Sequence, residues 1–392
     1  MIKTVKKIIS YIMVCVLFLS MCIPCEAAQT STATASDANA TTGFPQITST
    51  SAIIMDAQSG QIIYEKNSHT RQYPASITKI MTAYLAIKNG DLNSTITMSD
   101  AAVWGIDRNS SHIALDVGEE ISMSDALYAV MLMSANEAAW AIAEQVSGSL
   151  ENFVQLMNDT AQSLGCKDTH FTNANGLHDP DHYTTAYDMA LITKEALTSK
   201  TFREYASETY HEIPPTNMNN ETRYLTQGNR MMLSNSEYYY PACQGGKTGY
   251  TDDAGGTLVV WAEKNDMQLI CVTMGAPDNA TNYTDSIALF NYVFNNYSNT
   301  TLLSDYEFDA EAATTAQNFL NDYYGCENLG TMHLSVDNNQ PFIFANNADR
   351  AHYHQIALIV GLIHSLQNRF VKLLKGIFLD FNFEFSCFKI TA

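Results

Sequence analysis

The chain has 392 residues, of which 46% are hydrophobic and 10% aromatic, so it can bury enough apolar surface to offset the entropy of ordering and is not a disordered protein. Asp and Glu number 41 against 21 Lys and Arg, which gives a net charge of −20 at pH 7. Because phosphate binding needs a positive surface, this acidity argues against a nucleic-acid partner.

The N-terminal segment 1–27 has the organisation of a secretory signal peptide. Three lysines precede the apolar run 8–23, and small residues follow where a signal peptidase cleaves. A retained membrane anchor is the alternative, but the run is short for a membrane span. We therefore expect an exported protein, followed at 28–43 by a flexible leader that is rich in Ser, Thr and Ala.

The folded body is predicted to contain two β-hairpins. Two short apolar segments, 51–55 and 61–65, flank a turn that contains glycine, which is typical of a hairpin. The alternating, β-branched segments 256–262 and 267–274 predict a second hairpin.

Helices are predicted mainly between the two hairpins. Apolar residues recur at helical spacing in 75–88, which predicts a buried helix. Four further helices, each starting near a Ser, Asn or Thr that can cap it, are predicted at 124–133, 136–146, 150–164 and 185–197, and a last helix at 285–297. Strands, then helices, then strands again indicate an α+β fold with a mainly antiparallel sheet, rather than alternating βαβ units.

The cysteines indicate neither a disulfide framework nor a metal site. Of the eight cysteines, three lie in the signal segment, which leaves Cys166, Cys243, Cys271, Cys326 and Cys387. This set is odd in number and scattered, and it contains no CxxC pair. We expect buried small side chains, with no metal and no other cofactor.

A first candidate motif, SxxK, runs from Ser76 to Lys79 at the predicted start of the helix 75–88. Residues three apart share a helix face, so the Ser76 hydroxyl and the Lys79 amine can meet. A lysine can take the proton of a serine nucleophile if burial or a nearby cation lowers its pKa, and a helix start offers free N–H groups for an oxyanion. Alone the pattern is weak, since residues 386–389 also fit it.

Two further motifs follow in order. Ser134 and Asn136 place a hydroxyl and an amide on a short turn between predicted helices. Lys247, Thr248 and Gly249 follow two glycines and precede a predicted strand, so a cation and a hydroxyl can project from a sheet edge toward a carboxylate. The order SxxK, SxN, KTG, with 58 and then 113 residues between motif starts, makes a strong combined signal for acyl transfer.

With these motifs the sequence resembles the D-alanyl-D-alanine carboxypeptidases, low-molecular-mass penicillin-binding proteins of the serine acyl-transferase and β-lactamase superfamily. The likeness extends over about residues 44–295 and is carried by the segments 73–83, 133–139, 171–177, 182–190 and 246–251. The resemblance implies a serine β-lactamase/transpeptidase-like fold, with an antiparallel sheet flanked by helices and a mainly helical subdomain.

The resemblance also implies a role for each residue of the first two motifs. Ser76 would attack the carbonyl between the last two D-alanines of a peptidoglycan stem peptide, and Lys79 would take its proton. Ser134 would relay a proton to the departing D-alanine amine. Asn136 would hold both the substrate amide and Lys79.

The third motif would bind the end of the substrate. Lys247 and Thr248 would meet the terminal carboxylate beside Gly249, and the backbone N–H groups of Ser76 and Tyr250 would form the oxyanion hole. Water would then hydrolyse the acyl-enzyme. β-Lactam antibiotics would acylate the serine and block it, and the enzyme would act at the outer face of the bacterial cytoplasmic membrane or in the cell wall.

The chain departs from the family at one point. Members often carry an arginine soon after the last core strand, near the substrate carboxylate, whereas residues 279–285 contain none. Either Lys247 and Thr248 suffice, or the carboxylate is held more weakly.

Three alternative functions remain open on this scaffold. A β-lactamase is disfavoured because the Glu-x-x-Leu-Asn pattern, which would supply a carboxylate for deacylation, is absent between Asn136 and Lys247. A D-Ala endopeptidase would use the same residues. A non-catalytic, penicillin-sensing wall-binding module would tolerate loss of Ser76 or Lys79, and their presence together argues against it.

The C-terminal part divides into a connecting region and a tail. The catalytic domain is predicted at 44–297, and 298–349 is a short connecting or partial β region. The tail 350–392 is basic, and its apolar residues recur at helical spacing from Ile359 to Ile377. Such a helix can lie on an anionic membrane surface, which predicts an anchor; a helix packed on the protein, or a tail read in a non-native frame, is the alternative.

Overall fold

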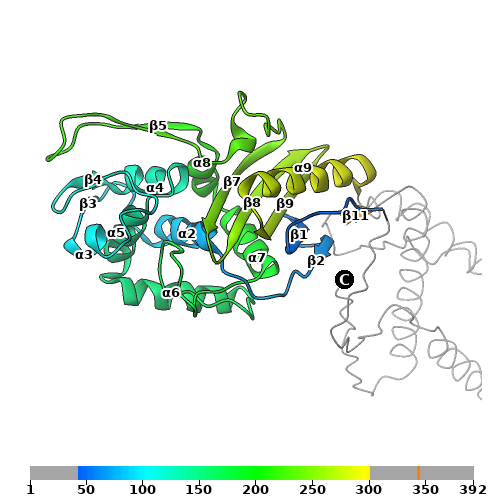
Figure 1. Cartoon of the computed structure of the whole chain (residues 1–392), viewed down its shortest axis with the longest axis horizontal. Helices are drawn as coiled ribbons and strands as arrows, with labels where there is room; N and C mark the ends of the chain where they lie inside the picture. The colour runs from blue at the N-terminus through cyan, green and yellow to red at the C-terminus, as the bar shows by residue number, and fades with distance from the viewer. Residues whose placement is uncertain (1–42, 301–341, 345–392) are drawn as a thin grey trace, which may run out of the picture. The chain divides into compact units, whose positions relative to one another are not determined.

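The computed structural model describes residues 43–300 and 342–344 (Figure 1). The predicted signal peptide, nearly all of the leader and the C-terminal tail lie outside the described residues, as does most of the connecting region. Within the described part of the chain, no helix combines the length and apolarity that crossing a membrane requires.

The central element is a five-stranded antiparallel sheet with the strand order β2-β1-β9-β8-β7. Its strands are β1 (Ser51–Asp56), β2 (Ile62–Lys66), β7 (Cys243–Thr251), β8 (Gly255–Lys264) and β9 (Met267–Ala276). Pairing of β1 with β9 joins the first hairpin to the second, with Ser51 opposite Met274. Both predicted hairpins and the antiparallel sheet are confirmed.

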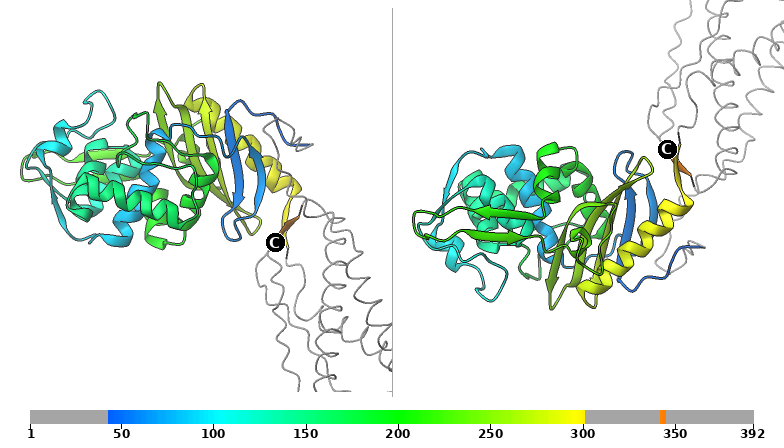
Figure 2. Two further views of the ribbon diagram at one scale, coloured as in Figure 1. Left: turned by 90° about the horizontal axis from the view of Figure 1, so that it is seen from below. Right: turned by 90° about the horizontal axis from the view of Figure 1, so that it is seen from above.

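Side chains of the sheet contribute to two cores, one on each face. In β1, Ile53 and Met55 belong to one core, whereas Ala52 and Ile54 belong to the other, because successive side chains of a strand point to opposite faces. Helix α9 (Asn279–Asn296) covers the second face, as Figure 2 shows from two sides. The strand is therefore buried on both faces, which explains its continuous apolar sequence.

The first face packs against a mainly helical part of the chain. Its helices are α2 (Lys79–Asn89), α3 (Asp100–Trp104), α4 (Met123–Leu132), α5 (Asn136–Ser147), α6 (Leu150–Ser163), α7 (Ala186–Ala196) and α8 (Lys200–Ser207). The helices predicted on this side of the sheet are confirmed to within a few residues, whereas α9 begins at Asn279, six residues before its predicted start. The side chains of Ser122, Ser149 and Thr185 accept hydrogen bonds from the first turns of α4, α6 and α7. The sequence did not predict α3 or α8, which are too short to show a clear period.

Three two-stranded antiparallel sheets and two 3-10 turns complete the described structure. The paired strands are β3 (Thr95–Thr97) with β4 (Glu120–Ser122), β5 (Tyr210–Ile213) with β6 (Arg223–Thr226), and β10 (Ser298–Thr300) with β11 (Phe342–Phe344). The 3-10 turns are η1 (Ala75–Thr78) and η2 (Arg230–Met232). Of these, η1 matters most for the site, since it leads directly into α2.

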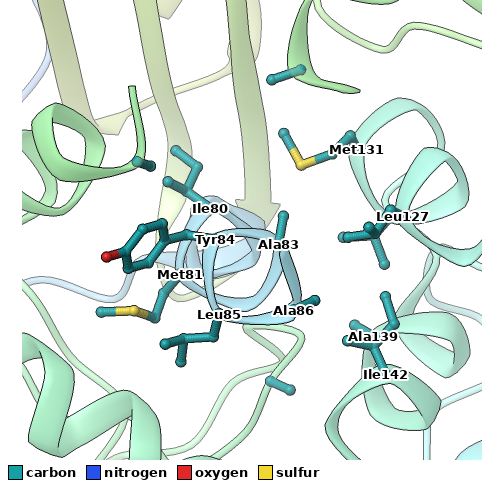
Figure 3. Packing of buried hydrophobic residues seen from close by; sticks show 14 of the residues in the cluster. Ile80, Met81, Ala83, Tyr84, Leu85, Ala86, Leu127, Met131, Ala139 and Ile142 are labelled. Atoms are coloured by element: carbon teal, nitrogen blue, oxygen red, sulfur yellow. The ribbon is translucent and has the colours of Figure 1, made fainter. Parts of the chain in front are cut away.

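Helix α2 lies at the centre of the helical part. Every residue from Lys79 through Ala86 is buried. In Figure 3, Leu127 and Met131 of α4 and Ile142 of α5 lie beside it. Because α2 is surrounded by other elements, it is a core helix, and its first residue, Lys79, is buried inside the protein.

Candidate active site

The first motif forms the 3-10 turn η1 and the first residue of α2. Lys79 Nζ lies 3.0 Å from Ser76 Oγ, so the predicted contact between these side chains is confirmed. The prediction that Ser76 begins an α-helix is wrong in detail, because the α-helix starts at Lys79 and the serine lies in the tighter turn before it. Ala75 has a φ of +49°, a left-handed conformation that L residues disfavour and that is concentrated at functional sites.

The amine of Lys79 contacts three oxygen atoms. Besides Ser76 Oγ, Nζ donates to Asn136 Oδ1 at 2.6 Å and to the backbone carbonyl of Asn175 at 2.5 Å. Both of these partners are oxygens that only accept hydrogen bonds. A neutral amine has two N–H bonds and one lone pair, so the two acceptors occupy both hydrogens and leave the lone pair for the Ser76 hydroxyl. This is the geometry of a general base beside a nucleophile.

The surroundings of Lys79 favour its neutral form. Burial lowers the pKa of its amine well below the ordinary value, since the ammonium would lose its hydration. The nearby charge of Lys247 lowers this pKa further, and the carboxylate of Glu137 acts in the opposite direction. The sequence analysis predicted that Lys79 can act as a base only if its pKa is lowered in this way.

The second motif lies at the junction of α4 and α5. Ser134 has a φ of +59°, and its Oγ atom is shielded from solvent without a hydrogen-bond partner among the described residues. Asn136 Nδ2 donates to Ser110 Oγ at 2.8 Å, which fixes the amide with its oxygen toward Lys79. A buried hydroxyl in a strained turn, with no partner, is available to bond a ligand.

The third motif precedes strand β8 and lies at an edge of the sheet, as the sequence predicted, but it is itself part of a strand, β7, that the sequence did not predict. Lys247 is buried, and its Nζ donates to the carbonyl of Thr248 at 2.9 Å. Within residues 43–300 it forms no ion pair with a carboxylate. Burial lowers the pKa of Lys247 to about 7.

Gly249 explains how the first and third motifs come together. A Cβ atom at this position would lie 2.7 Å from the backbone nitrogen of Ser76 and 2.4 Å from Thr257 Oγ1. Only glycine therefore allows β7 to pass this close to η1, the turn that contains Ser76. The next residue, Tyr250, is 51% exposed at the end of the strand.

Sequence reasoning missed two groups that hold the site. The carbonyl of Asn175 binds Lys79, and Ser110 orients Asn136. The segment around Asn175 carried part of the family resemblance, but a backbone carbonyl leaves no signature in a residue pattern.

Within the described residues, no cluster of His, Cys, Asp and Glu is arranged to hold a metal ion.

The antiparallel sheet with helices on both faces, and the three motifs that meet where its edge strand β7 packs against the helical part, define the DD-transpeptidase and penicillin-binding class of proteins. A family model described as D-alanyl-D-alanine carboxypeptidase, peptidase S11, matches residues 37–278. The chain belongs to this family.

Individual proteins agree with this assignment. D-alanyl-D-alanine carboxypeptidase DacF of Bacillus subtilis is 35% identical over 250 residues, covering 63% of this chain and 62% of its own length. DacA of Haemophilus influenzae is 36% identical over 266 residues, covering 64% of this chain and 63% of its own. The chain thus spans less than two thirds of the length of these curated relatives.

Solved structures show the same fold. The DD-transpeptidase of Streptomyces K15 superimposes with a TM-score of 0.59 at 25% identity, covering 64% of this chain and 98% of the transpeptidase. A D-alanyl-D-alanine carboxypeptidase of Mycobacterium tuberculosis gives a TM-score of 0.59 at 26% identity, covering 64% of this chain and 93% of its own. The predicted serine β-lactamase/transpeptidase-like fold is confirmed.

Proposed function

We propose that the protein is a serine-type D-Ala-D-Ala carboxypeptidase that removes the terminal D-alanine from peptidoglycan stem peptides through an acyl-enzyme on Ser76. The observation that supports this most directly is the position of Lys79 Nζ, 3.0 Å from Ser76 Oγ. The same amine donates hydrogen bonds to Asn136 Oδ1 and to the carbonyl of Asn175. Acyl transfer to a serine needs a base at this position.

Acylation begins as Ser76 Oγ attacks the carbonyl carbon between the two D-alanines and its proton passes to Lys79 Nζ. The oxygen of the tetrahedral intermediate accepts hydrogen bonds from the N–H groups of Ser76 and Tyr250. The C–N bond then breaks, and the D-alanine amine leaves with a proton delivered through Ser134. The unpartnered hydroxyl of Ser134 supports this relay.

Lys247 and Thr248 bind the terminal carboxylate, while Asn136 holds the substrate amide and Gly249 lets its backbone approach. Lys247 donates to a backbone carbonyl and forms no ion pair within the described residues, so no protein carboxylate competes with the substrate there. A bound carboxylate in turn stabilises the charged form of the lysine. These contacts serve in place of the arginine that the family often carries.

Deacylation returns the enzyme to its starting state. Water attacks the ester carbonyl and gives a proton to Lys79, the ester bond to Ser76 breaks, Lys79 returns the proton to Ser76 Oγ, and the shortened peptide leaves with a new carboxylate. A β-lactam offers its ring carbonyl to the same serine, and its opened ring remains attached, so it blocks the enzyme.

Location is also part of this proposal. An exported enzyme meets peptidoglycan outside the cytoplasmic membrane, and a basic amphipathic tail at 350–392 would hold it near the membrane surface. Protein ending at Asp349 is then expected to leave the membrane fraction, and unchanged membrane retention would contradict the anchor.

The test of the activity uses protein without residues 1–27, a fluorescent penicillin and a pentapeptide that ends in D-Ala-D-Ala. The unsubstituted protein should take the label and release D-alanine, and Ser76→Ala should do neither. Ser163→Ala, at a serine that bonds the carbonyl of Thr160 within the exposed end of α6, serves as the matched control and should react normally. Absence of both labelling and D-alanine release would refute the proposal, and rapid turnover of penicillin would indicate a β-lactamase.

A further inference from the structure

Resting on the proposed function, we infer that His182 and Thr78 are positioning residues for the oxyanion hole. They hold the peptide unit between Ala75 and Ser76 so that the Ser76 N–H points toward the substrate carbonyl. Neither side chain contacts Ser76 Oγ or Lys79 Nζ through a hydrogen bond. They act through the backbone carbonyl of Ala75.

Two side chains form a relay that ends on this carbonyl. Thr78 Oγ1 donates to the carbonyl oxygen of Ala75 at 2.8 Å and lies 2.9 Å from His182 Nε2. A hydroxyl has one hydrogen, so Thr78 must accept from His182, which places the imidazole hydrogen on Nε2. His182 Nδ1 agrees with this assignment, because it accepts from the backbone N–H of Thr172 at 3.0 Å.

The hydrogen-bond donor of this relay, the Nε2–H group of His182, does not change with pH in the neutral range. His182 is 2% exposed, and burial lowers its pKa to about 3. The charge of Asp179 raises this pKa, whereas His170, Lys79 and His178 lower it. The imidazole is therefore neutral throughout the neutral pH range and keeps the Nε2 hydrogen that Thr78 accepts.

Fixing the carbonyl of Ala75 also fixes the direction of the Ser76 N–H group. The described residues contain no cis peptide bond, so the C=O of Ala75 and the N–H of Ser76 point in opposite directions from one planar unit. On the carbonyl side, a Cβ atom at Gly176 would lie 1.9 Å from the oxygen of Ala75. On the opposite side, a Cβ atom at Gly249 would lie 2.7 Å from the nitrogen of Ser76. A side chain at either glycine would therefore collide with this peptide unit.

The peptide unit needs such support because its backbone is strained. Ala75 has a φ of +49°, which an alanine leaves when nothing holds it there. Thr257 Oγ1 donates to the carbonyl of Pro74 at 2.8 Å and fixes the preceding peptide unit. The relay from His182 fixes the next one, whose N–H the reaction uses.

The test compares Thr78→Val, which keeps the shape but removes the hydroxyl, with Thr78→Ser, which keeps the hydroxyl. Stopped-flow labelling with a fluorescent penicillin separates the dissociation constant of the first complex from the acylation rate constant. Loss of one oxyanion donor costs about a hundredfold or more in other enzymes, so we expect misalignment in Thr78→Val to lower the acylation rate constant by about ten- to a hundredfold. The dissociation constant and the pH profile should be unchanged, and Thr78→Ser should restore the rate.

A matched control separates positioning from stability. Thr193 is also fully buried and its hydroxyl donates to the carbonyl of Met189 at 2.7 Å, away from the nucleophile turn. Thr193→Val should lower the thermal unfolding midpoint as Thr78→Val does, but it should acylate at the unsubstituted rate. A peptide boronic acid, whose adduct with the serine fills the oxyanion hole, should bind Thr78→Val more weakly and Thr193→Val normally.

Equal acylation rates for Thr78→Val and the unsubstituted protein would overturn the inference, as would an equal loss in Thr193→Val. Failure of the unsubstituted protein to be acylated would refute the proposed function instead. If Thr78→Val does not fold, the pair His182→Gln and His182→Leu replaces it. The glutamine amide can donate in place of Nε2, so His182→Gln should acylate faster than His182→Leu, and equal rates would overturn the inference.

Discussion

Replacement of the amide of Asn136 by a carboxylate tests whether the charge state of Lys79 limits acylation. Asn136 Oδ1 lies 2.6 Å from Lys79 Nζ, and both side chains are buried. Asn136→Asp keeps the shape of the side chain and adds a negative charge next to the amine. This charge favours the ammonium form, which has no lone pair for the proton of Ser76.

The size of the effect follows from this distance. With an effective dielectric constant of about 20, unit charges 2.6 Å apart attract each other by about 6 kcal/mol. A free energy of about 1.4 kcal/mol corresponds to a factor of ten in a protonation equilibrium, so even two thirds of this attraction would raise the pKa of Lys79 and favour its ammonium form by about a thousandfold. Because the amine accepts a proton only above its pKa, acylation at neutral pH should fall by up to about a thousandfold.

The assay measures the rate of labelling by a fluorescent penicillin from neutral to alkaline pH. The profile of Asn136→Asp should move to higher pH, and its rate should recover in alkaline solution. Asn93→Asp adds the same charge at an exposed position and should leave the profile unchanged. An unshifted profile for Asn136→Asp would refute the assignment of Lys79 as the titrating base.

Alkaline pH should weaken the recognition of a free carboxylate, because burial lowers the pKa of Lys247 to about 7 and its side chain is cationic only below that value. The kcat/KM for a peptide with a free C-terminus should then fall above this pH relative to its methyl ester, and parallel curves would contradict this. Gly176→Ala should abolish penicillin labelling, since its Cβ would lie 1.9 Å from the carbonyl oxygen before the nucleophile. Gly165→Ala, which has a similar left-handed backbone but no atom within 4 Å, should lose about 1 kcal/mol of unfolding free energy and label normally. Glu119→Gln should lower the free energy of unfolding in urea at neutral pH by about 3 kcal/mol, because it leaves the guanidinium of Arg223 without its buried partner. Burial raises the pKa of Glu119, but the hydrogen bonds that it accepts, chiefly from Arg223, outweigh burial, so the net effect is a lowered pKa. The stability difference between the unsubstituted protein and Glu119→Gln should therefore be present at neutral pH and lost as the pH falls through the carboxyl range. A constant difference down to low pH would contradict this.

The sequence predicted the elements whose composition carries a period and missed the one that the site needs most. Strand β1 and helix α2 have long apolar patterns, so their type follows from the residues alone. Strand β7 contains three glycines and a buried lysine, and its extended form depends on its partner, with Lys247 opposite Val259 of β8. Pairing between distant segments is a property of the whole sheet, and no local pattern predicts it.

The contacts of the candidate site could likewise be predicted from the sequence only in part. The contact between Ser76 and Lys79 follows from spacing on one turn, and the structure confirms it. The contact of Lys79 with Asn136 was expected only from the family resemblance, since 57 residues separate the two along the chain. The burial that lowers the Lys79 pKa could not be predicted from the motif, because it depends on the helices that surround α2.

One segment outside the three motifs links the proposed base, Lys79, to the proposed oxyanion hole. Asn173 Oδ1 accepts from the N–H of Gly176 at 2.7 Å, and this turn presents the carbonyl of Asn175 to Lys79. The same turn presses Gly176 against the carbonyl before the nucleophile, and His182 closes the relay to that carbonyl. The direction of the lysine lone pair and the direction of the serine N–H are therefore set by a single loop. Since attack on a carbonyl needs the base and the oxyanion donor on the correct sides of the same atom, a shift of this loop would misplace both groups at once.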